Sequence, residues 1–277
     1  MAPHRALLLG IVQGPTEVLP VSSSAHIALL ARAGGEPDRW RDSELRNSLE
    51  VALHAGAAAA LVIVLRGELA QGVRELNSES AVAMVLALGP PALVGYLLEQ
   101  RLEHRAGRPR TVAAGLALGG AAMVWADARP ARRRLADLKP RDGLALGVAQ
   151  ALALLPGVSR SGATLTAARA RGFAREDAHV LSWRAGLPVL AGAAALKAYR
   201  LGRSQGALAV DAHGRVGRSN ALSGSGPVLA AGAGAAFLST LACAPLLGRG
   251  PRSRPLWPFA LYRAGVALAG WRSSASA

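Results

Sequence analysis

"GIVQGPTEVLPVSSSAH", residues 10–26, is an apolar stretch that glycine and proline interrupt and that ends in three serines and a histidine. Proline removes a backbone hydrogen-bond donor and clashes with the preceding turn of a helix. The surrounding apolar segment, residues 6–31, is therefore not expected to form one continuous helix. The residues expected to interrupt it are Gly10, Gly14, Pro15 and Pro20.

A second apolar segment, residues 143–168, is interrupted in the same way. Pro156, Gly157 and Gly162 break it, and Arg160 lies in its middle. At membrane depth, irregular backbone survives only where protein or trapped water satisfies its polar groups. Both segments are therefore predicted to be re-entrant or broken helices that line a cavity.

The composition is typical of closely packed membrane helices. Of the 277 residues, 51% are hydrophobic but only 4% are aromatic, so alanine, leucine, valine and glycine fill the apolar positions. A helix needs about 20 mostly apolar residues to cross a bilayer. We predict an all-α integral membrane protein, a multi-span helical bundle that forms a single polytopic domain over residues 1–277. The candidate spans are residues 49–65, 80–98, 111–126, 180–199, 226–247 and 256–271.

The formal charge of +15 lies mainly in short segments between the apolar runs. A nucleic-acid-binding protein would instead present basic faces on amphipathic elements with aromatic stacking platforms, so nucleic acid is not an expected partner. The most basic segment, "DARPARRRLADLKPRD" at residues 127–142, holds six Lys or Arg residues. Because basic residues favour the cytoplasmic side of a membrane, this segment is predicted to be cytoplasmic.

Two pairs of matching segments indicate an internal duplication. "GIVQGPTEVLPVSSS" from Gly10 and "GVAQALALLPGVSRS" from Gly147 share Gly, Gln, Leu-Pro and a serine cluster in the same order. "GPPALVG" from Gly89 matches "GLPVLAG" later in the chain at four positions. We predict repeat halves of roughly residues 1–126 and 143–271, with the site where their broken helices meet.

Glu17 lies between two prolines in the first broken segment. An ionised carboxylate inside a bilayer is costly unless it is paired, hydrated or bound to a metal. Gln13 lies four residues earlier, on the same face of a helix, and is able to offer a carbonyl oxygen to the same cation. Oxygen ligands suit Mg²⁺ or Ca²⁺, so either cation is an expected cofactor.

Ser22, Ser23, Ser24 and His26 follow Glu17 within ten residues. A serine run alone is most often a helix cap or a turn. A hydroxyl beside an imidazole is also the minimum arrangement for nucleophilic attack, and it suits hydrogen bonding to a phosphate. The combination with Glu17 therefore indicates a reactive site.

"PGVSRSGAT", residues 156–164, has the composition of an anion-binding turn. Small residues let backbone N–H groups face a ligand, and the helix N-terminus that follows favours an anion. Arg160 adds a planar, permanently charged donor for phosphate oxygens. The alternative is an interfacial turn with an arginine that reaches the membrane surface.

The two motif regions, residues 10–26 and 147–164, together resemble the undecaprenyl-diphosphatase family, whose members are also called bacitracin-resistance proteins. The family's first motif is Glu or Gln, three residues, Glu, then Leu-Pro and a serine-rich turn ending in His, and residues 13–26 match it. Its second motif, Pro-Gly-x-Ser-Arg-Ser-Gly-Ala-Thr, is matched without exception by residues 156–164. Weaker similarities at "LEVALHAG", "GFAR" and "PFALYR" extend the resemblance over almost the whole chain.

The resemblance implies a membrane phosphatase that converts undecaprenyl diphosphate to undecaprenyl phosphate and inorganic phosphate. Such an enzyme recycles the lipid carrier of cell-wall synthesis and gives bacitracin resistance. The implied fold is an inverted-repeat helical bundle with two re-entrant hairpins in the bacterial inner (plasma) membrane, with the site facing the extracytoplasmic side. The implied partners are a polyprenyl diphosphate lipid and the membrane, while the oligomeric state stays open, with a homodimer as one option.

The candidate site combines both motifs. The expected roles are catalytic for Glu17, Ser23, His26 and Arg160, metal-binding for Gln13 and Glu17, and substrate-binding for Ser22, Ser24, Ser159, Ser161, Gly162 and Thr164. Attack by Ser23 and attack by a water activated by His26 are both compatible with the sequence.

Several residues depart from the family pattern. Ala25 replaces a usual glycine, and Pro15 is unusual in the first motif. Arg169, Arg171 and Arg184 introduce charges where the family is mostly apolar or small. Arg184 lies within a predicted span and is expected to pair with a carboxylate such as Glu50 or to lie toward an interface.

A transporter or flippase for a polyprenyl phosphate is the main alternative. Repeats, discontinuous helices and buried charges are typical of transporters as well as of this enzyme family. In that case Arg160 and the serines would bind the head group without cleaving it. Hydrolysis needs acid–base capacity, so Glu17 together with His26 favours the phosphatase. A purely structural membrane protein would leave both motifs unexplained.

Overall fold

The structure, a computed structural model, describes residues 2–33, 43–105, 109–206, 208–210, 216–218 and 225–273. These residues are almost entirely helical, which confirms the all-α prediction. The helices are α1 (Pro3–Val18), α2 (Ser23–Ala33), α4 (Ser43–Val64), α5 (Arg66–Arg74), α6 (Ser78–Arg105), α7 (Pro109–Asp127), η1 (Leu135–Asp137), α8 (Pro140–Leu152), α9 (Arg160–Ala170), α10 (Arg175–Gly206), α11 (Gly226–Ala242), η2 (Ala244–Leu247), α12 (Arg249–Ser253) and α13 (Trp257–Ser273). A short antiparallel hairpin of β1 (Leu208–Val210) and β2 (Val216–Arg218) follows α10.

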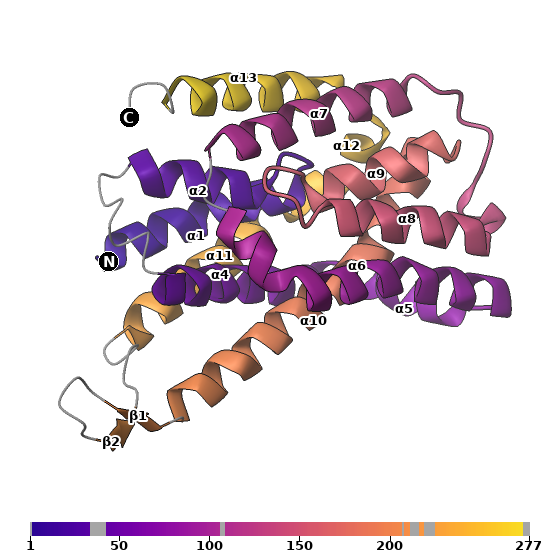
Figure 1. The fold of residues 1–277 in the computed structure, drawn as a ribbon. Helices are drawn as coiled ribbons and strands as arrows, with labels where there is room; N and C mark the ends of the chain where they lie inside the picture. The colour runs from indigo at the N-terminus through magenta and orange to yellow at the C-terminus, as the bar shows by residue number, and fades with distance from the viewer. Residues whose placement is uncertain are drawn as a thin grey trace.

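Both predicted breaks are present, but Gly162, expected to interrupt the second segment, lies inside α9. In the first segment α1 ends at Val18 and α2 begins at Ser23, and in the second α8 ends at Leu152 and α9 begins at Arg160. Each pair of helices forms a hairpin. Figure 1 shows the α1–α2 hairpin in the left half of the molecule and the α8–α9 hairpin in the right half, with their turns meeting between them.

The break in the first segment lies at Pro20, and the expectation that Gly10, Gly14 and Pro15 interrupt the helix is wrong. Helix α1 runs through all three of these residues. Proline at position 15 has no N–H to donate to the carbonyl of Ile11, four residues earlier. The hydroxyl of Ser239 on α11 donates to that carbonyl instead, at 2.6 Å, so a neighbouring helix satisfies the group that the proline leaves open.

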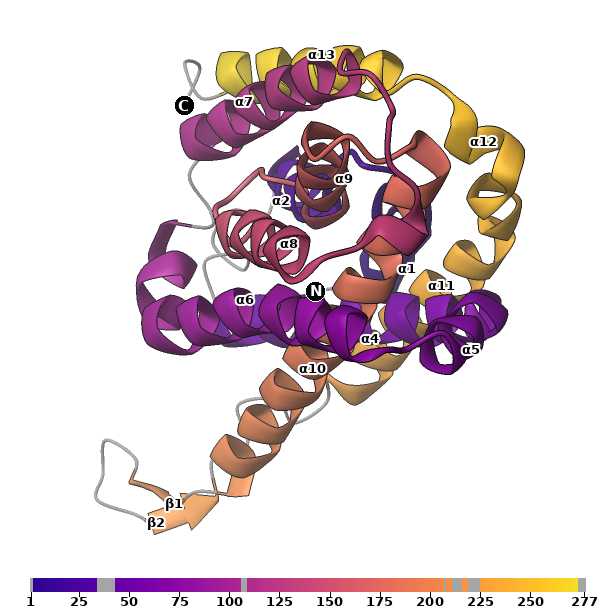
Figure 2. The same ribbon diagram turned by 90° about the vertical axis from the view of Figure 1, so that its right-hand side faces the viewer.

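Glycines let two pairs of helices approach closely. A Cβ on Gly10 or Gly14 of α1 would overlap backbone or side-chain atoms of α11, and a Cβ on Gly143 or Gly147 of α8 would overlap atoms of α6. Small residues four positions apart allow this kind of contact between membrane helices. Figure 2 shows the result, with α2, α8 and α9 enclosed by a ring that includes α4, α6, α7, α11 and α13.

Each of the six candidate spans coincides with a helix: α4, α6, α7, α10, α11 or α13. Within the described residues, two helical segments are long and apolar enough to cross a membrane, Leu45–Val64 and Ser78–Leu98, and Gly226–Ala242 is a shorter apolar helix. Two such helices alone are a weak indication of a membrane protein. The six-span topology therefore stays a prediction.

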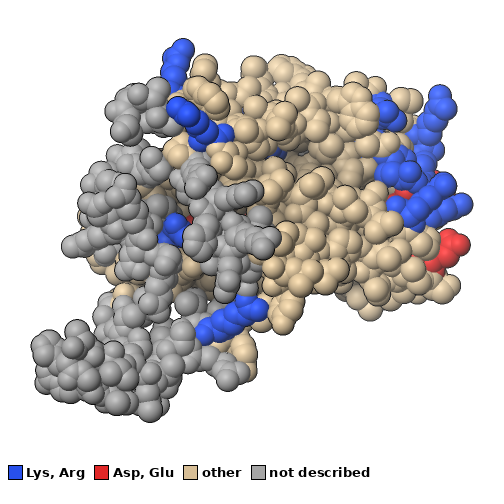
Figure 3. Space-filling model, in the orientation of Figure 1, with Lys and Arg blue, Asp and Glu red and all other residues tan. Residues whose placement is uncertain are grey.

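The outer surface of the bundle is strongly apolar. Leu93 and Leu97 of α6, Leu118 of α7, Leu238 of α11 and Leu261 of α13 are each at least 60% exposed. Water-soluble monomers rarely expose apolar side chains on so many helices at once. Figure 3 shows the charged side chains mainly at the two ends of the molecule, with an uncharged surface between them.

Buried ion pairs organise the end of the molecule that carries the basic segment. Asp127 accepts hydrogen bonds from Arg169 and Arg175, and Asp142 accepts them from Arg133 and Arg171. Burial alone would raise the pKa of the Asp142 carboxyl. The hydrogen bonds from Arg133, Arg171 and the Lys139 N–H outweigh burial and lower the pKa to about 2. The unusual Arg169 and Arg171 are thus structural ion-pair partners of the α7–α9 region.

Candidate active site

The turns of the two helical hairpins form opposite walls of one cavity of about 340 Å³. Residues 22–24 line it from the first turn and residues 153–161 line it from the second, while α4 and α10 complete the wall. Both α2 and α9 begin at this cavity, so two helix N-termini face it. Helix N-termini favour anions because their first N–H groups are unpaired and the helix dipole is positive there.

Glu17 is the polar centre of the cavity. Its Oε1 accepts a hydrogen bond from Arg160 Nη2 at 2.7 Å, and its Oε2 accepts bonds from Ser23 Oγ at 2.7 Å and from Gln13 Nε2 at 3.2 Å. The carboxylate is only 6% exposed, so the arginine offsets a charge that would otherwise be costly to bury. This pair joins the first motif to the second across 143 residues of sequence.

The serine turns have a similar construction in the two hairpins. Ser22 Oγ lies 3.3 Å from Ser24 Oγ, and Ser159 Oγ lies 3.2 Å from Ser161 Oγ. Ser159 also caps α9 by accepting a hydrogen bond from Gly162 N. Ser22 has a φ of 75°, a left-handed conformation that costs about 1–3 kcal/mol in a residue with a side chain. Such strain is often found at functional sites.

The four predicted substrate-binding serines and three of the four predicted catalytic residues, Glu17, Ser23 and Arg160, line the cavity. The fourth catalytic candidate, His26, is directed elsewhere. Its Nδ1 bonds the carbonyl of Ser22 and its Nε2 bonds the hydroxyl of Tyr262, each at 2.8 Å, and the two rings stack. A different histidine, His54 of α4, lines the cavity with its Nε2 3.8 Å from Glu17 Oε2.

Gly162 and Thr164 have other contacts than those predicted. Thr164 is fully buried and shares a hydrogen bond of 2.6 Å with Ser182 of α10. A Cβ at Gly162 would come within 2.7 Å of Arg263 Nη1, so this glycine leaves room for that guanidinium. Neither residue lines the cavity. Their predicted contact with substrate stays a prediction.

Arg263 of α13 holds the two turns together, a role that sequence reasoning missed. Its guanidinium is 1% exposed and donates to the carbonyls of Pro20 in the first turn and Gly157 in the second, at 3.3 and 3.5 Å. It also donates to the carbonyls of Gly115 and Leu116 in α7 at 3.2 Å. Only its place in "PFALYR", a weak family similarity, pointed to it.

The donor atoms around the cavity suit a hard cation that substrate oxygens help to bind. Glu17 and Glu50 both line it with carboxylates, and the serine hydroxyls add further oxygens. The Oε1 of Gln13 is buried without a hydrogen-bond partner, and rotation of the amide would turn it toward Glu17. No group of three His, Cys, Asp or Glu side chains suited to a metal occurs within the part of the chain that the structure describes. Mg²⁺ commonly uses one or two carboxylates and completes its shell with substrate phosphates.

Arg184, the third unusual arginine, lies outside this cavity. It pairs with Glu75 at 3.2 Å, so the suggested pairing with Glu50 is wrong. Glu75 follows α5, and no periodicity in the sequence connects it with α10.

Comparison with known proteins places these residues in a family context. Residues 6–269 match the family model described as bacitracin resistance protein BacA. The chain is 39% identical over 219 residues to an undecaprenyl-diphosphatase of Geobacter metallireducens, covering 73% of this chain and 78% of that protein. An undecaprenyl-diphosphatase of Pelobacter propionicus is 35% identical over 272 residues, covering 93% of this chain and 92% of the relative. An undecaprenyl-diphosphatase of Pelotomaculum thermopropionicum is 37% identical over 205 residues, or 71% and 75% of the two chains.

Proposed function

The chain belongs to the family of bacitracin resistance protein BacA, and from this premise we propose that it hydrolyses undecaprenyl diphosphate to undecaprenyl phosphate and inorganic phosphate. This reaction returns the lipid carrier to cell-wall synthesis. Because bacitracin resistance is part of the family's name, we expect the chain to contribute to it. The proposal rests on one observation. The two motifs come together at one cavity, which is lined by Glu17, Ser23 and Arg160.

The geometry supports Ser23 as the nucleophile and Glu17 as its base. Ser23 Oγ already donates to Glu17 Oε2 at 2.7 Å, the arrangement of a hydroxyl beside the group that takes its proton. In the proposed step, Ser23 Oγ forms a bond to the terminal phosphorus and its proton passes to Glu17. The bridging P–O bond breaks, and undecaprenyl phosphate leaves with the electron pair. Water then hydrolyses the phosphoserine and releases inorganic phosphate.

Arg160 has the position to stabilise the transferring phosphoryl group. One terminal nitrogen, Nη2, holds Glu17, while Nη1 is buried without a hydrogen-bond partner. This nitrogen lies against Gly186 of α10, so a modest movement of the side chain is needed before both terminal nitrogens can bind phosphate oxygens. Charge neutralisation by cations and oriented N–H groups is the main contribution to phosphoryl transfer. A divalent cation held by Glu17 and Glu50, with Gln13 as a further oxygen donor, would add to it by neutralising the diphosphate.

The expected activity is phosphate release that requires a divalent cation. Purified protein in detergent should release phosphate from undecaprenyl diphosphate with Mg²⁺ or Ca²⁺ and lose this activity in excess EDTA, because Arg160 alone would leave the charge of the diphosphate and of the nearby carboxylates partly uncompensated. The matched control is Ser23→Ala protein purified in parallel, which reports any contaminating phosphatase. Binding of the lipid without phosphate release would favour the transporter, and full turnover in EDTA with negligible metal content would remove the cation from the proposal.

We further propose that the protein is a multi-pass protein of the bacterial plasma membrane in which both hairpins are re-entrant. The apolar outer surface supports this placement, and so does the similar packing of α1 on α11 and of α8 on α6, which an inverted repeat would produce. With the basic segment in the cytoplasm, the site would open to the extracytoplasmic side.

This topology predicts where a membrane-impermeant thiol reagent reacts. After Cys243 is replaced by alanine, cysteines introduced at Ser24 and Leu155, which are exposed and line the cavity from different hairpins, should both be labelled from the extracytoplasmic side. A cysteine at Lys139 in the basic segment is the control and should be labelled only from the cytoplasmic side. Labelling of Ser24→Cys and Leu155→Cys from opposite sides would contradict one shared site.

A further inference from the structure

A second, larger cavity of about 570 Å³ lies on another face of α10. Helix α10 separates the two spaces, because Val189, Leu190 and Ala193 face the active-site cavity while Leu181, Arg184 and Pro188 face the second one. The other walls come from α5, the start of α6, and the segment that includes η1.

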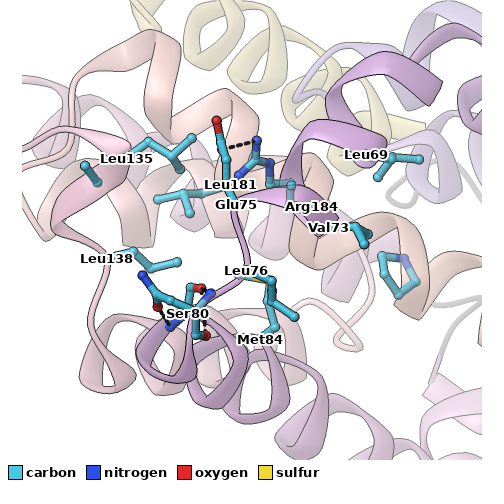
Figure 4. Close-up of a pocket in the computed structure, with 14 residues that line it drawn as sticks. Leu69, Val73, Glu75, Leu76, Ser80, Met84, Leu135, Leu138, Leu181 and Arg184 are labelled. Atoms are coloured by element: carbon cyan, nitrogen blue, oxygen red, sulfur yellow. Dashed lines mark hydrogen bonds and ion pairs between the residues drawn. The ribbon is translucent and has the colours of Figure 1, made fainter.

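The lining of this cavity is mainly apolar, with charge on one side. Leu76 and Met84 line it from the α6 side, and Leu135 and Leu138 line it from the segment before α8. Figure 4 shows these side chains around the ion pair of Glu75 and Arg184, the two charged residues that line the cavity. A cavity with a long apolar wall and one cation fits an amphiphile better than it fits a small polar ligand.

Arg184 is incompletely satisfied. Its Nη2 donates to Glu75 Oε2 at 3.2 Å, but its Nε is buried and has no hydrogen-bond partner. Glu75 is 48% exposed, and solvent-exposed ion pairs contribute little because water and salt compete for both charges. An incoming anion would compete for the guanidinium with this partly exposed carboxylate, which also accepts a hydrogen bond from Gln71 Nε2 at 2.7 Å.

The surroundings also favour an anion. The segment that forms one wall carries the exposed basic residues Arg129, Arg132, Lys139 and Arg141, while Arg134 in the same segment pairs with Asp177 at 3.7 Å. Clustered basic residues beside a membrane attract anionic lipid head groups. Figure 3 shows this group of Lys and Arg side chains at the right-hand end of the molecule.

We propose that this second cavity binds a lipid with one phosphate group and a net negative charge, with the phosphate on Arg184 and the chain along the wall of Leu76, Met84 and Leu138. Two lipids supply this chemistry: an anionic phospholipid of the bilayer and a polyprenyl monophosphate. The site uses none of the residues of the active-site cavity, so its existence is independent of hydrolysis.

The test is lipid binding to intact protein in detergent, measured by native mass spectrometry with phosphatidylglycerol, undecaprenyl phosphate and phosphatidylcholine in separate titrations. Arg184→Gln should weaken binding of the anionic lipid by about tenfold, the factor expected for the loss of one hydrogen bond to a charged group. Glu75→Gln should act in the opposite direction and tighten binding several-fold, because it removes the competing carboxylate. Arg134→Gln, which removes an exposed arginine at the same end, is the matched control and should leave the dissociation constant within about twofold, as expected for a screened surface charge.

Opposite effects of the two variants cannot arise from general loss of structure, and unchanged melting temperatures would confirm that both fold. The lipid whose binding changes in these variants, phosphatidylglycerol or undecaprenyl phosphate, identifies the source of the ligand. The proposal is overturned if phosphatidylcholine binds equally well, or if Arg184→Gln behaves like Arg134→Gln. Because the experiment measures lipid binding, its result tests this second site whether or not the protein releases phosphate.

Discussion

Arg160→Ala is expected to lower the rate of phosphate release from undecaprenyl diphosphate by about 10²- to 10³-fold, the usual effect of removing one donor that stabilises transition-state charge. Arg160 is the cation that lines the cavity opposite the serine turn, and it also neutralises Glu17. Its loss therefore removes a phosphate ligand and leaves the proposed base without its counter-charge. The measurement is steady-state turnover after the melting temperature in detergent shows that the variant is folded.

Arg160→Lys separates charge from geometry. A guanidinium offers a planar pair of donors, whereas an ammonium is a point charge, so lysine should retain part of the substrate binding but lose most of the rate. That pattern follows if the second hydrogen bond strengthens only as charge moves onto the leaving phosphate. If Arg160→Ala turned over within about threefold of wild type, the second motif would be a structural turn and the site would lie elsewhere.

The Arg160 guanidinium can also be moved by a substitution at a neighbouring residue, with Arg160 itself unchanged. A Cβ on Gly186 of α10 would overlap Arg160 Nη1, whereas a Cβ on Gly192 of the same helix would meet no atom within 4 Å. Because the overlapped atom is the end of a flexible side chain, Gly186→Ala should shift Arg160 with little loss of stability and lower turnover markedly. Gly192→Ala is the matched control and should keep both turnover and melting temperature.

The helix breaks are the part of the fold that the sequence predicts best, because proline acts locally. Pro20 lies in the turn between α1 and α2, and Pro156 and Gly157 lie in the turn between α8 and α9. Pro15 shows the limit of the same argument. Its missing N–H is compensated by the Ser239 hydroxyl, which lies 228 positions from Ile11 and binds the Ile11 carbonyl, so tertiary contact overrides a local rule.

The candidate site is predictable where motifs concentrate polar groups and not where single residues reach it from distant helices. Glu17, Ser23 and Arg160 belong to recognisable patterns, and the structure brings them together. Arg263 lies 243 positions from Pro20, whose carbonyl it binds, and its own segment offers only a weak family similarity. His26 is adjacent to the serines in sequence, but the helical turn directs it to Tyr262, while His54 reaches the cavity from α4.

These placements are the basis for proposing Ser23, rather than a water activated by His26, as the nucleophile. A water activated by His26 would need an imidazole nitrogen that faces the cavity, and both of its ring nitrogens are engaged with Ser22 and Tyr262 instead. Ser23 lines the cavity and is already bonded to a carboxylate. We therefore propose covalent catalysis through Ser23.

Ser23→Ala is accordingly expected to reduce turnover by about 10³-fold or more, because loss of a nucleophile removes the covalent route and leaves only the contributions of charge and binding. Ser24→Ala is the matched control. Ser24 is an exposed hydroxyl of the same turn, bonded to Ser22 at 3.3 Å, and its loss should cost no more than about tenfold, as for a single neutral hydrogen bond.

The intermediate itself provides the decisive measurement. Acid quenching of wild-type protein during turnover, followed by mass spectrometry of its peptides, should detect phosphate on Ser23, whose Oγ would form the new bond to phosphorus. The Ser23→Ala protein should still bind undecaprenyl diphosphate, because Arg160 and the two helix N-termini are unchanged. If Ser23→Ala retained turnover within tenfold of wild type and no phosphoserine were found, water would be the nucleophile. Ser23 would then serve to position Glu17, the one carboxylate that both motifs contact directly.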